Sequence, residues 1–150
     1  MKTVILLAPL LSLQTFAWSQ TSLQVKGNYA LLNLHTGSFL GMGAAQKIVL
    51  DKATTTHWNV QPLDGGGYTL KETASGNTLQ PARGRKKAGE ALEMKPQDGS
   101  DAQQYELIEA EGGQCWIRLK GTDLYLTASG TAVVLQPFQE GDLQRWKLRP

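Results

Sequence analysis

The sequence predicts an all-β domain made of three repeats of four short strands each. Bulky aromatic residues recur at Trp58, Tyr105 and Trp146, in steps of 47 and 41 residues, and a period of this length indicates a repeat architecture. Apolar residues alternate with polar ones on both sides of turns that contain Gly or Asp, which is typical of hairpins with one buried face. No long segment keeps the period of an α-helix. Three units of four strands are the plan of a β-trefoil with pseudo-threefold symmetry, in which six strands close a barrel and three hairpins cap it.

The first two strands of each repeat align without a gap from Gly27, Gly66 and Gly113. The same apolar types then recur at fixed offsets, which places them on one buried face. The aligned sets are Tyr29, Tyr68 and Cys115; Leu31, Leu70 and Ile117; and Leu40, Leu79 and Leu126. We therefore expect these positions to form the core, with Cys115 as a small buried hydrophobic residue.

A third strand is predicted at 47–51, 90–95 and 132–137, and a fourth begins at each recurring aromatic residue. The repeats are expected at about 27–62, 65–110 and 111–150. Because Trp58, Tyr105 and Trp146 occupy equivalent positions, we predict that their rings fill the bottom of the barrel.

The N-terminus predicts export. Residues 1–19 combine an early Lys2, the apolar run Val4–Leu13 and small residues at Ala17 and Ser19, which is the pattern of a cleaved signal peptide. The domain is expected to span 20–150 and to be secreted or periplasmic, with no membrane insertion after cleavage.

Composition excludes several function classes. The chain has a formal net charge of +2 and one cysteine, Cys115. The near-neutral charge and the lack of interleaved basic and aromatic residues argue against nucleic acid as a partner. A single cysteine cannot form an internal disulfide. Two histidines and one cysteine without ligand spacing predict no metal site, and no motif suggests a cofactor.

The motif Gln144-Arg145-Trp146 closes the third repeat, and weaker versions close the others: Gln103-Gln104-Tyr105 in the second and Thr56-His57-Trp58 in the first. A Gln-x-Trp motif at this phase of a threefold repeat resembles the ricin-type β-trefoil lectin domains. The resemblance covers Gly27–Pro150 and implies a β-trefoil that binds carbohydrate.

The resemblance also implies a sugar pocket in each repeat, which this sequence does not reproduce. The family places an aspartate after the second-strand leucine, an aromatic ring at the end of the third strand and an asparagine before Gln-x-Trp. The corresponding residues here are Gly41, Gln80 and Thr127; Asp51, Lys95 and Gln136; and Thr55, Ala102 and Leu143. Sugar binding is therefore expected to use other residues.

Two surfaces are candidates. Trp116 alternates with Cys115 and Ile117, so it is predicted to face away from the core, either to stack on a sugar or to be covered by residues 20–26. The loop Pro81–Glu90 either is a solvated hairpin tip or pairs with sulfate, phosphate or uronate groups. Its cations and the flanking pocket positions make up the second candidate site, namely Gln80, Arg83, Arg85, Lys86, Lys87 and Lys95.

Catalysis has little support, because His35 and His57 lie in different parts of the repeat and no nucleophile–base pair can be assembled. A glycosidase-like carboxylate pair among Glu72, Glu90 and Glu93 is disfavoured, since these residues lie on a hairpin and a loop. We expect a non-catalytic carbohydrate-binding domain with acidic glycans as candidate ligands. The alternative is a trefoil that binds a protein partner through its loops and has no sugar site.

Overall fold

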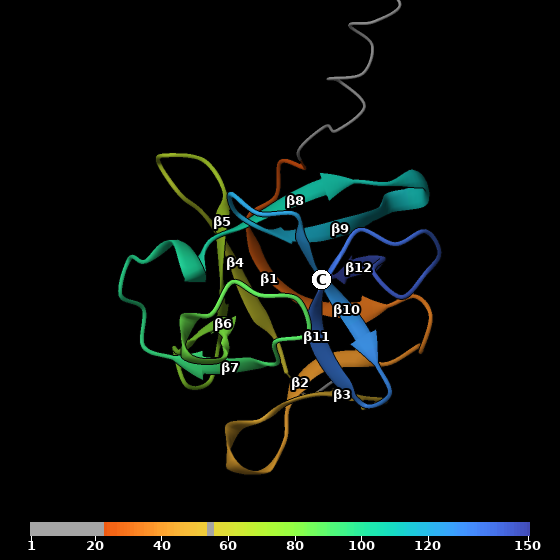
Figure 1. The fold of residues 1–150 in the computed structure, drawn as a ribbon, viewed down its shortest axis with the longest axis horizontal. Helices are drawn as coiled ribbons and strands as arrows, with labels where there is room; N and C mark the ends of the chain where they lie inside the picture. The colour runs from red at the N-terminus through yellow and green to blue at the C-terminus, as the bar shows by residue number, and fades with distance from the viewer. Residues whose placement is uncertain (1–22, 54–55) are drawn as a thin grey trace, which may run out of the picture.

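The computed structural model describes residues 23–53 and 56–150, so the predicted signal peptide lies outside the described residues. Twelve β-strands lie in this described part (Figure 1). Those of the first repeat are β1 (Gly27–Asn33), β2 (Phe39–Met42), β3 (Ile48–Asp51) and β4 (Trp58–Pro62). Those of the second are β5 (Tyr68–Glu72), β6 (Thr78–Pro81), β7 (Leu92–Lys95) and β8 (Tyr105–Glu109). Those of the third are β9 (Gln114–Leu119), β10 (Leu124–Ser129), β11 (Ala132–Pro137) and β12 (Trp146–Arg149).

The helical segments in the described residues are single 3₁₀ turns between strands. They are η2 (Ala44–Gln46), η3 (Ala82–Gly84), η4 (Asp101–Gln103) and η5 (Glu111–Gly113). Across the described residues, no helix has the length and apolar character needed to cross a bilayer. The predicted all-β class is confirmed.

The first and fourth strands of the repeats close a six-stranded antiparallel barrel. Each strand pairs with the next in the order β1–β4–β5–β8–β9–β12, and β12 pairs back with β1. The last register aligns Leu31 with Leu148 and Asn33 with Trp146. Closure removes the unpaired edges that an open sheet would expose.

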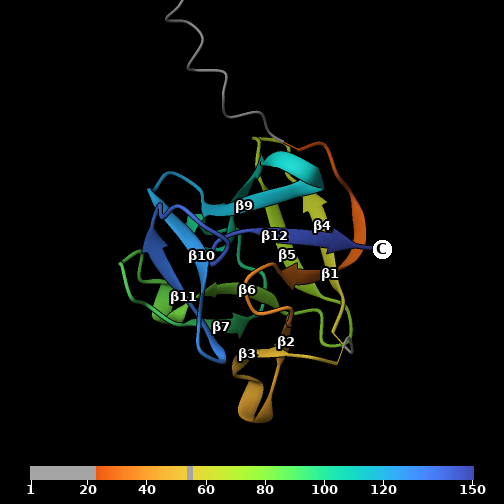
Figure 2. The same cartoon turned by 90° about the vertical axis from the view of Figure 1, so that its right-hand side faces the viewer.

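The second and third strands form the three hairpins β2–β3, β6–β7 and β10–β11. In Figure 2 the hairpins β2–β3 and β6–β7 lie toward the bottom, away from β9 at the top. Backbone bonds join neighbouring hairpins, since Leu50 N donates to Thr131 O at 2.9 Å and Gly89 N donates to Leu135 O at 2.7 Å. These contacts hold the three hairpins together as one cap, and the predicted β-trefoil is confirmed.

The core contains the aligned positions that the repeat predicts, apart from Tyr29, which is half-buried and packs against the core. Leu31, Leu70 and Ile117 are buried, and so are their second-strand counterparts. Cys115 is fully buried among them, and burial raises the pKa of its thiol to about 12. It therefore packs as a small apolar side chain, as the sequence predicts.

The three recurring aromatic residues hold the barrel to the hairpins through equivalent hydrogen bonds. Each ring is fully buried, and each donates to the carbonyl of the aligned second-strand leucine. Trp58 Nε1 bonds Leu40 O at 3.0 Å, Tyr105 OH bonds Leu79 O at 3.0 Å, and Trp146 Nε1 bonds Leu126 O at 3.1 Å. Burial raises the pKa of the Tyr105 phenol, which keeps this group protonated and able to donate. The rings thus pack in the core, as predicted, and also fix each hairpin.

We predict that Tyr105→Phe lowers the free energy of unfolding by about 1–2 kcal/mol, because it leaves the buried Leu79 carbonyl without this donor. Tyr105→Ala should cost about 3–5 kcal/mol, because it also opens a cavity. Urea unfolding of both variants measures the two contributions. Equal losses would contradict a separate role for the hydroxyl group.

Candidate functional site

The glutamine of the Gln-x-Trp motif is hydrogen-bonded to the second-strand position and to the loop after the third strand. In the middle repeat, Gln103 Nε2 donates to Gln80 Oε1 and to Pro96 O, both at 3.0 Å. Its Oε1 accepts from Asp98 N at 2.9 Å. The glutamine therefore ties the end of β6 to the loop after β7.

The third repeat repeats this arrangement. Gln144 Nε2 donates to Thr127 Oγ1 and Pro137 O, both at 2.9 Å, and its Oε1 accepts from Gln139 N at 2.8 Å. Thr127 is only 3% exposed. This second-strand position therefore serves the internal network in the third repeat.

The first repeat replaces the pair with smaller residues. Gly41 occupies the second-strand position, and a Cβ atom there would lie 3.2 Å from Thr56 Oγ1. Thr56 is the residue that replaces the glutamine, and its side chain packs closely against the backbone of Gly41, where the other repeats have a glutamine network.

A hollow of about 390 Å³ lies beside this network in the middle repeat. Three of the residues predicted for the site, Gln80, Arg83 and Lys86, line it. The rest of the lining comes from Gly84 and the segment Asp98–Ala102, with Asp98, Ser100, Asp101 and Ala102 facing the hollow. The structure thus brings half of the predicted loop residues to one concave surface.

Gln80 forms the floor of this hollow and is not a free ligand group. It is 6% exposed, and its Nε2 donates to Glu93 Oε2 at 2.9 Å while its Oε1 accepts from Gln103. Glu93 Oε2 also accepts from the backbone N–H of Arg83 at 2.9 Å. The bond holds Arg83 in a left-handed conformation with φ of 58°, which is unfavourable for a residue other than glycine.

The cations of the hollow differ in how they are engaged. Lys86 Nζ lies 3.9 Å from Asp101 Oδ2, in a pair whose side chains are both exposed, so the pair contributes little to stability. Asp98 accepts from Ser100 N at 2.8 Å, and these hydrogen bonds from Ser100 lower the pKa of the carboxyl group. Within the described residues, the Arg83 guanidinium takes part in no ion pair.

The other predicted cations of this loop lie outside the lining of the hollow. Arg85, Lys87 and Lys95 are exposed. Lys95 lies at the end of β7, opposite Thr78. The structure does not bring these three side chains into the same concave surface as Arg83.

Trp116 lies on the outer face of β9, with its neighbours Cys115 and Ile117 fully buried and its own side chain half-buried. This is the predicted alternation. The ring of Phe138 meets it edge to face at 5.6 Å, and the Arg145 guanidinium lies 5.6 Å from its centre. Leu23 and Val25 belong to the segment predicted as an alternative cover for Trp116. Their backbone N–H groups donate to Leu107 O and to the Tyr68 hydroxyl.

Phe138 is a surface residue that sequence reasoning missed. The repeat alignment put Gln136 at the third-strand end, where the family places its stacking ring, and Phe138 follows two residues later. It is 47% exposed. An isolated aromatic residue in the polar segment Gln136–Asp142 was the available signal.

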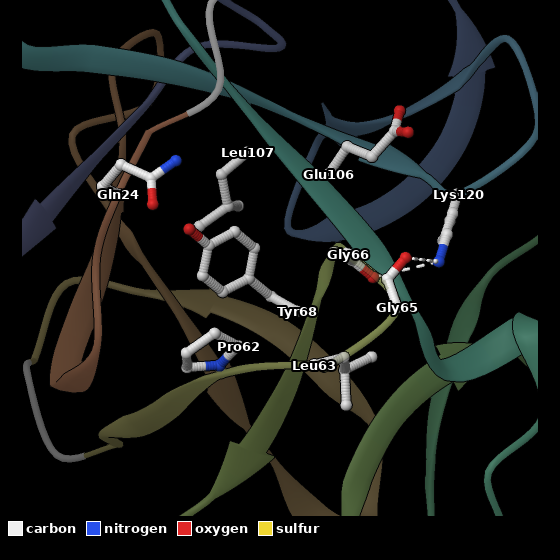
Figure 3. A pocket seen from close by; sticks show the side chains of 10 residues that line it. Gln24, Pro62, Leu63, Gly65, Gly66, Tyr68, Glu106, Leu107 and Lys120 are labelled. Carbon is white, nitrogen blue, oxygen red and sulfur yellow. Dashed lines mark hydrogen bonds between the residues drawn. The ribbon is translucent and has the colours of Figure 1, made fainter.

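Another hollow, of about 380 Å³, lies beside the β4–β5 loop near Tyr68 (Figure 3). Lys120 reaches this loop and donates to Gly66 O at 2.9 Å and to Gln104 Oε1 at 3.2 Å. The cation therefore stabilises the loop. None of the site residues predicted from the sequence lines this hollow.

Two of the carboxylates considered for catalysis are engaged in internal hydrogen bonds. Glu72 is buried and accepts from Ala74 N and Ser75 N, at 3.2 and 2.8 Å, within its own turn. Glu93 is bound to Gln80 and Arg83. Among the described residues, no cluster of three His, Cys, Asp or Glu side chains could hold a metal ion.

Comparison with known proteins identifies the family. The profile of the ricin-type beta-trefoil lectin domain-like family matches residues 54–136. The chain belongs to this family. A search of curated protein sequences found no match, so the ricin-type assignment comes from the family profile.

Several solved structures share the fold at low sequence identity. The designed threefold-symmetric protein ThreeFoil is 22% identical, with a TM-score of 0.76 over 83% of this chain and 99% of its own. A Macrolepiota procera ricin B-like lectin in complex with lactose is 21% identical, with a TM-score of 0.73 over 87% of this chain and 100% of its own. An exo-β-1,3-galactanase from Clostridium thermocellum is 20% identical, with a TM-score of 0.70 over 86% of this chain and 31% of its own.

We predict that Gln103→Leu lowers the free energy of unfolding by about 2–3 kcal/mol, because three partners lose their hydrogen bonds. The matched control is Gln97→Leu, an exposed change in the same loop, which should cost less than about 0.5 kcal/mol. Urea unfolding provides the measurement. Equal stability of the two variants would contradict the structural role of Gln103.

Proposed function

We propose that the protein is an exported, non-catalytic carbohydrate-binding domain that binds acidic glycans through the middle-repeat hollow. The observation that carries this proposal is the Arg83 guanidinium, which lies on a concave surface without an ion pair among the described residues. Family membership supports carbohydrate as the ligand class, as does the lactose complex of the Macrolepiota procera lectin.

The shape of the loop favours a glycan over a protein partner. A protein-binding loop would project, whereas Gln80, Arg83 and Lys86 line a hollow. Asp98, Ser100 and Asp101 line the same hollow. A sugar bound there would meet donors from Arg83 and Lys86 and acceptors from the two carboxylates.

The charges favour an acidic group. Lys86 is only weakly held by Asp101, and Arg83 offers a planar fork of donors that matches a carboxylate or sulfate. Arg85 and Lys87 are exposed on the same loop and add positive potential at its rim. The left-handed φ of 58° at Arg83 recurs at Ala45, the middle residue of η2, so this conformation is a feature of the turn.

The engagement of three side chains supports a non-catalytic role. The Cys115 thiol is buried and its pKa of about 12 keeps it protonated, so it cannot act as a nucleophile. Glu72 accepts hydrogen bonds within its own turn, and Glu93 accepts from Gln80 of the neighbouring strand β6. We therefore propose a module that binds glycan without cleaving it.

Arg83→Gly is the sharpest test, because it removes the guanidinium and also relieves the backbone strain. We expect a 10- to 100-fold loss of affinity for heparin and polygalacturonate, with stability within about 1 kcal/mol of the wild type. The control is Lys47→Gln, which also removes one exposed cation, after the corresponding turn η2 of the first repeat and outside this hollow. Binding is measured by calorimetry at two salt concentrations.

The wild-type affinity should fall as salt rises, because exposed charges are screened. Unchanged affinity in Arg83→Gly, or an equal loss in Lys47→Gln, would contradict the assignment of this hollow. Failure of the wild-type protein to bind any acidic or neutral glycan would overturn the proposed function and favour a protein partner.

Export rests on the leader pattern in residues 1–19. We predict that the protein recovered outside the cytoplasm begins at Gln20, because signal peptidase cleaves after small residues such as Ala17 and Ser19. Intact-mass measurement of that protein checks the position. A mass that retains the leader would contradict the cleavage site.

A further inference from the structure

A further concave surface lies in the third repeat, on the outer side of the barrel. It measures about 350 Å³ and is lined by Trp116 of β9, by Phe138–Gly141 of the β11–β12 loop and by Arg145. Thr127, at the second-strand position, is buried beneath Gln144 and is not part of this lining. This surface therefore differs from the family's sugar pocket, which would include the second-strand position Thr127.

Phe138 is held as a rigid platform. Its ring meets Trp116 and Tyr125 edge to face, with centroids 5.6 Å apart in both pairs and interplanar angles of 70° and 69°. Tyr125 is itself buried, so the contact anchors Phe138 to the body of the domain. Phe138 is nevertheless 47% exposed, and it is the exposed large hydrophobic residue of the described chain.

Contact between an exposed aromatic ring and water is unfavourable. A ligand with a flat apolar face would remove this ring surface from water, which favours binding. The C–H face of a sugar ring is such a surface. Because the platform is already ordered by two aromatic contacts, binding would require little further loss of side-chain entropy.

Polar groups surround the platform in a combination suited to hydroxyl groups. Gln139 and Glu140 are exposed lining residues, and a carboxylate accepts from two hydroxyls while an amide both donates and accepts. Arg145 Nη1 donates weakly to Gln114 Oε1 at 3.5 Å. Two buried donors of the lining residues, Trp116 Nε1 and Arg145 Nε, have no hydrogen-bond partner among the described residues.

This surface lacks the additional cations that border the middle-repeat hollow. That hollow is lined by two cations and two carboxylates, and the exposed Arg85 and Lys87 add positive charge on its loop. Glu140 and Arg145 carry opposite charges on the same lining, so the surface has no net charge. The Glu140 carboxylate would repel an anionic sugar. The chemistry therefore selects a neutral ligand here.

We propose that this third-repeat surface is a second glycan site, which binds a neutral sugar by stacking its ring on Phe138. Trp116 and Tyr125 position the platform, and Glu140, Gln139 and Arg145 bind hydroxyl groups. This inference rests on the proposed function as a carbohydrate-binding domain, and it adds a separate site and a separate ligand class.

Cellotriose is a suitable probe, because its equatorial hydroxyls leave flat C–H faces. Titration of the ¹⁵N-labelled protein should shift the Trp116 indole N–H resonance and leave those of Trp58 and Trp146 unchanged, since these two rings are fully buried and bonded. Phe138→Ser should weaken cellotriose binding at least about fivefold. Phe138→Tyr preserves the ring and should retain the wild-type affinity.

Two further measurements locate the effect. Arg83→Gly, in the other hollow, should leave cellotriose binding unchanged, and moderate salt should change it little, because stacking is not screened. Circular dichroism confirms that Phe138→Ser is folded, as expected for an exposed position.

Full affinity in Phe138→Ser, or an unshifted Trp116 resonance on saturation, would overturn this proposal. Loss of cellotriose binding in Arg83→Gly would also overturn it, because both ligands would then share one site. If acidic glycans bind while cellotriose does not, the second site fails and the proposed function stands. If the wild type binds neither class, the proposed function itself fails.

Discussion

The hydrogen bond from a buried ring to a leucine carbonyl is the interaction on which each repeat depends. It joins the fourth strand, part of the barrel, to the second strand, part of the hairpin, in all three units. Tyrosine replaces tryptophan in the middle repeat and still supplies a donor at the same distance. The repeats can therefore diverge elsewhere as long as a large ring with a polar hydrogen stays at this position.

The glutamine of the motif sets the next constraint. In the second and third repeats, it ties the second-strand position to the loop after the third strand. This use of Gln80 and Thr127 as internal partners leaves them nearly inaccessible. Any ligand chemistry is therefore displaced outward, to the residues that border this network.

The hollows of the middle and third repeats show how one fold can present different surfaces from equivalent repeats. The middle repeat has a longer loop after β6, which places Arg83 and Lys86 over Gln80. The third repeat has a short turn at this point but carries Phe138 and Trp116 on the outer side. Loop length and single substitutions change the chemistry, while the shared core keeps the scaffold constant.

The sequence by itself determined the class, the number of strands and the identity of the core. Positions such as Leu31, Leu70 and Ile117 recur at one offset, and burial on a closed barrel requires that alternation. It also determined that Trp116 would face away from the core. Both features follow from the regular spacing of apolar residues along the chain, which is visible in a single sequence.

Only the tertiary structure decided which side chains meet. It separated Arg85, Lys87 and Lys95 from the hollow that holds Arg83, since Arg85 and Lys87 follow η3 and Lys95 ends β7. It also brought Phe138 against Trp116 and Tyr125, from three strands or loops of the third repeat. Proximity of this kind depends on loop paths and strand closure, which alternation of residue types does not encode.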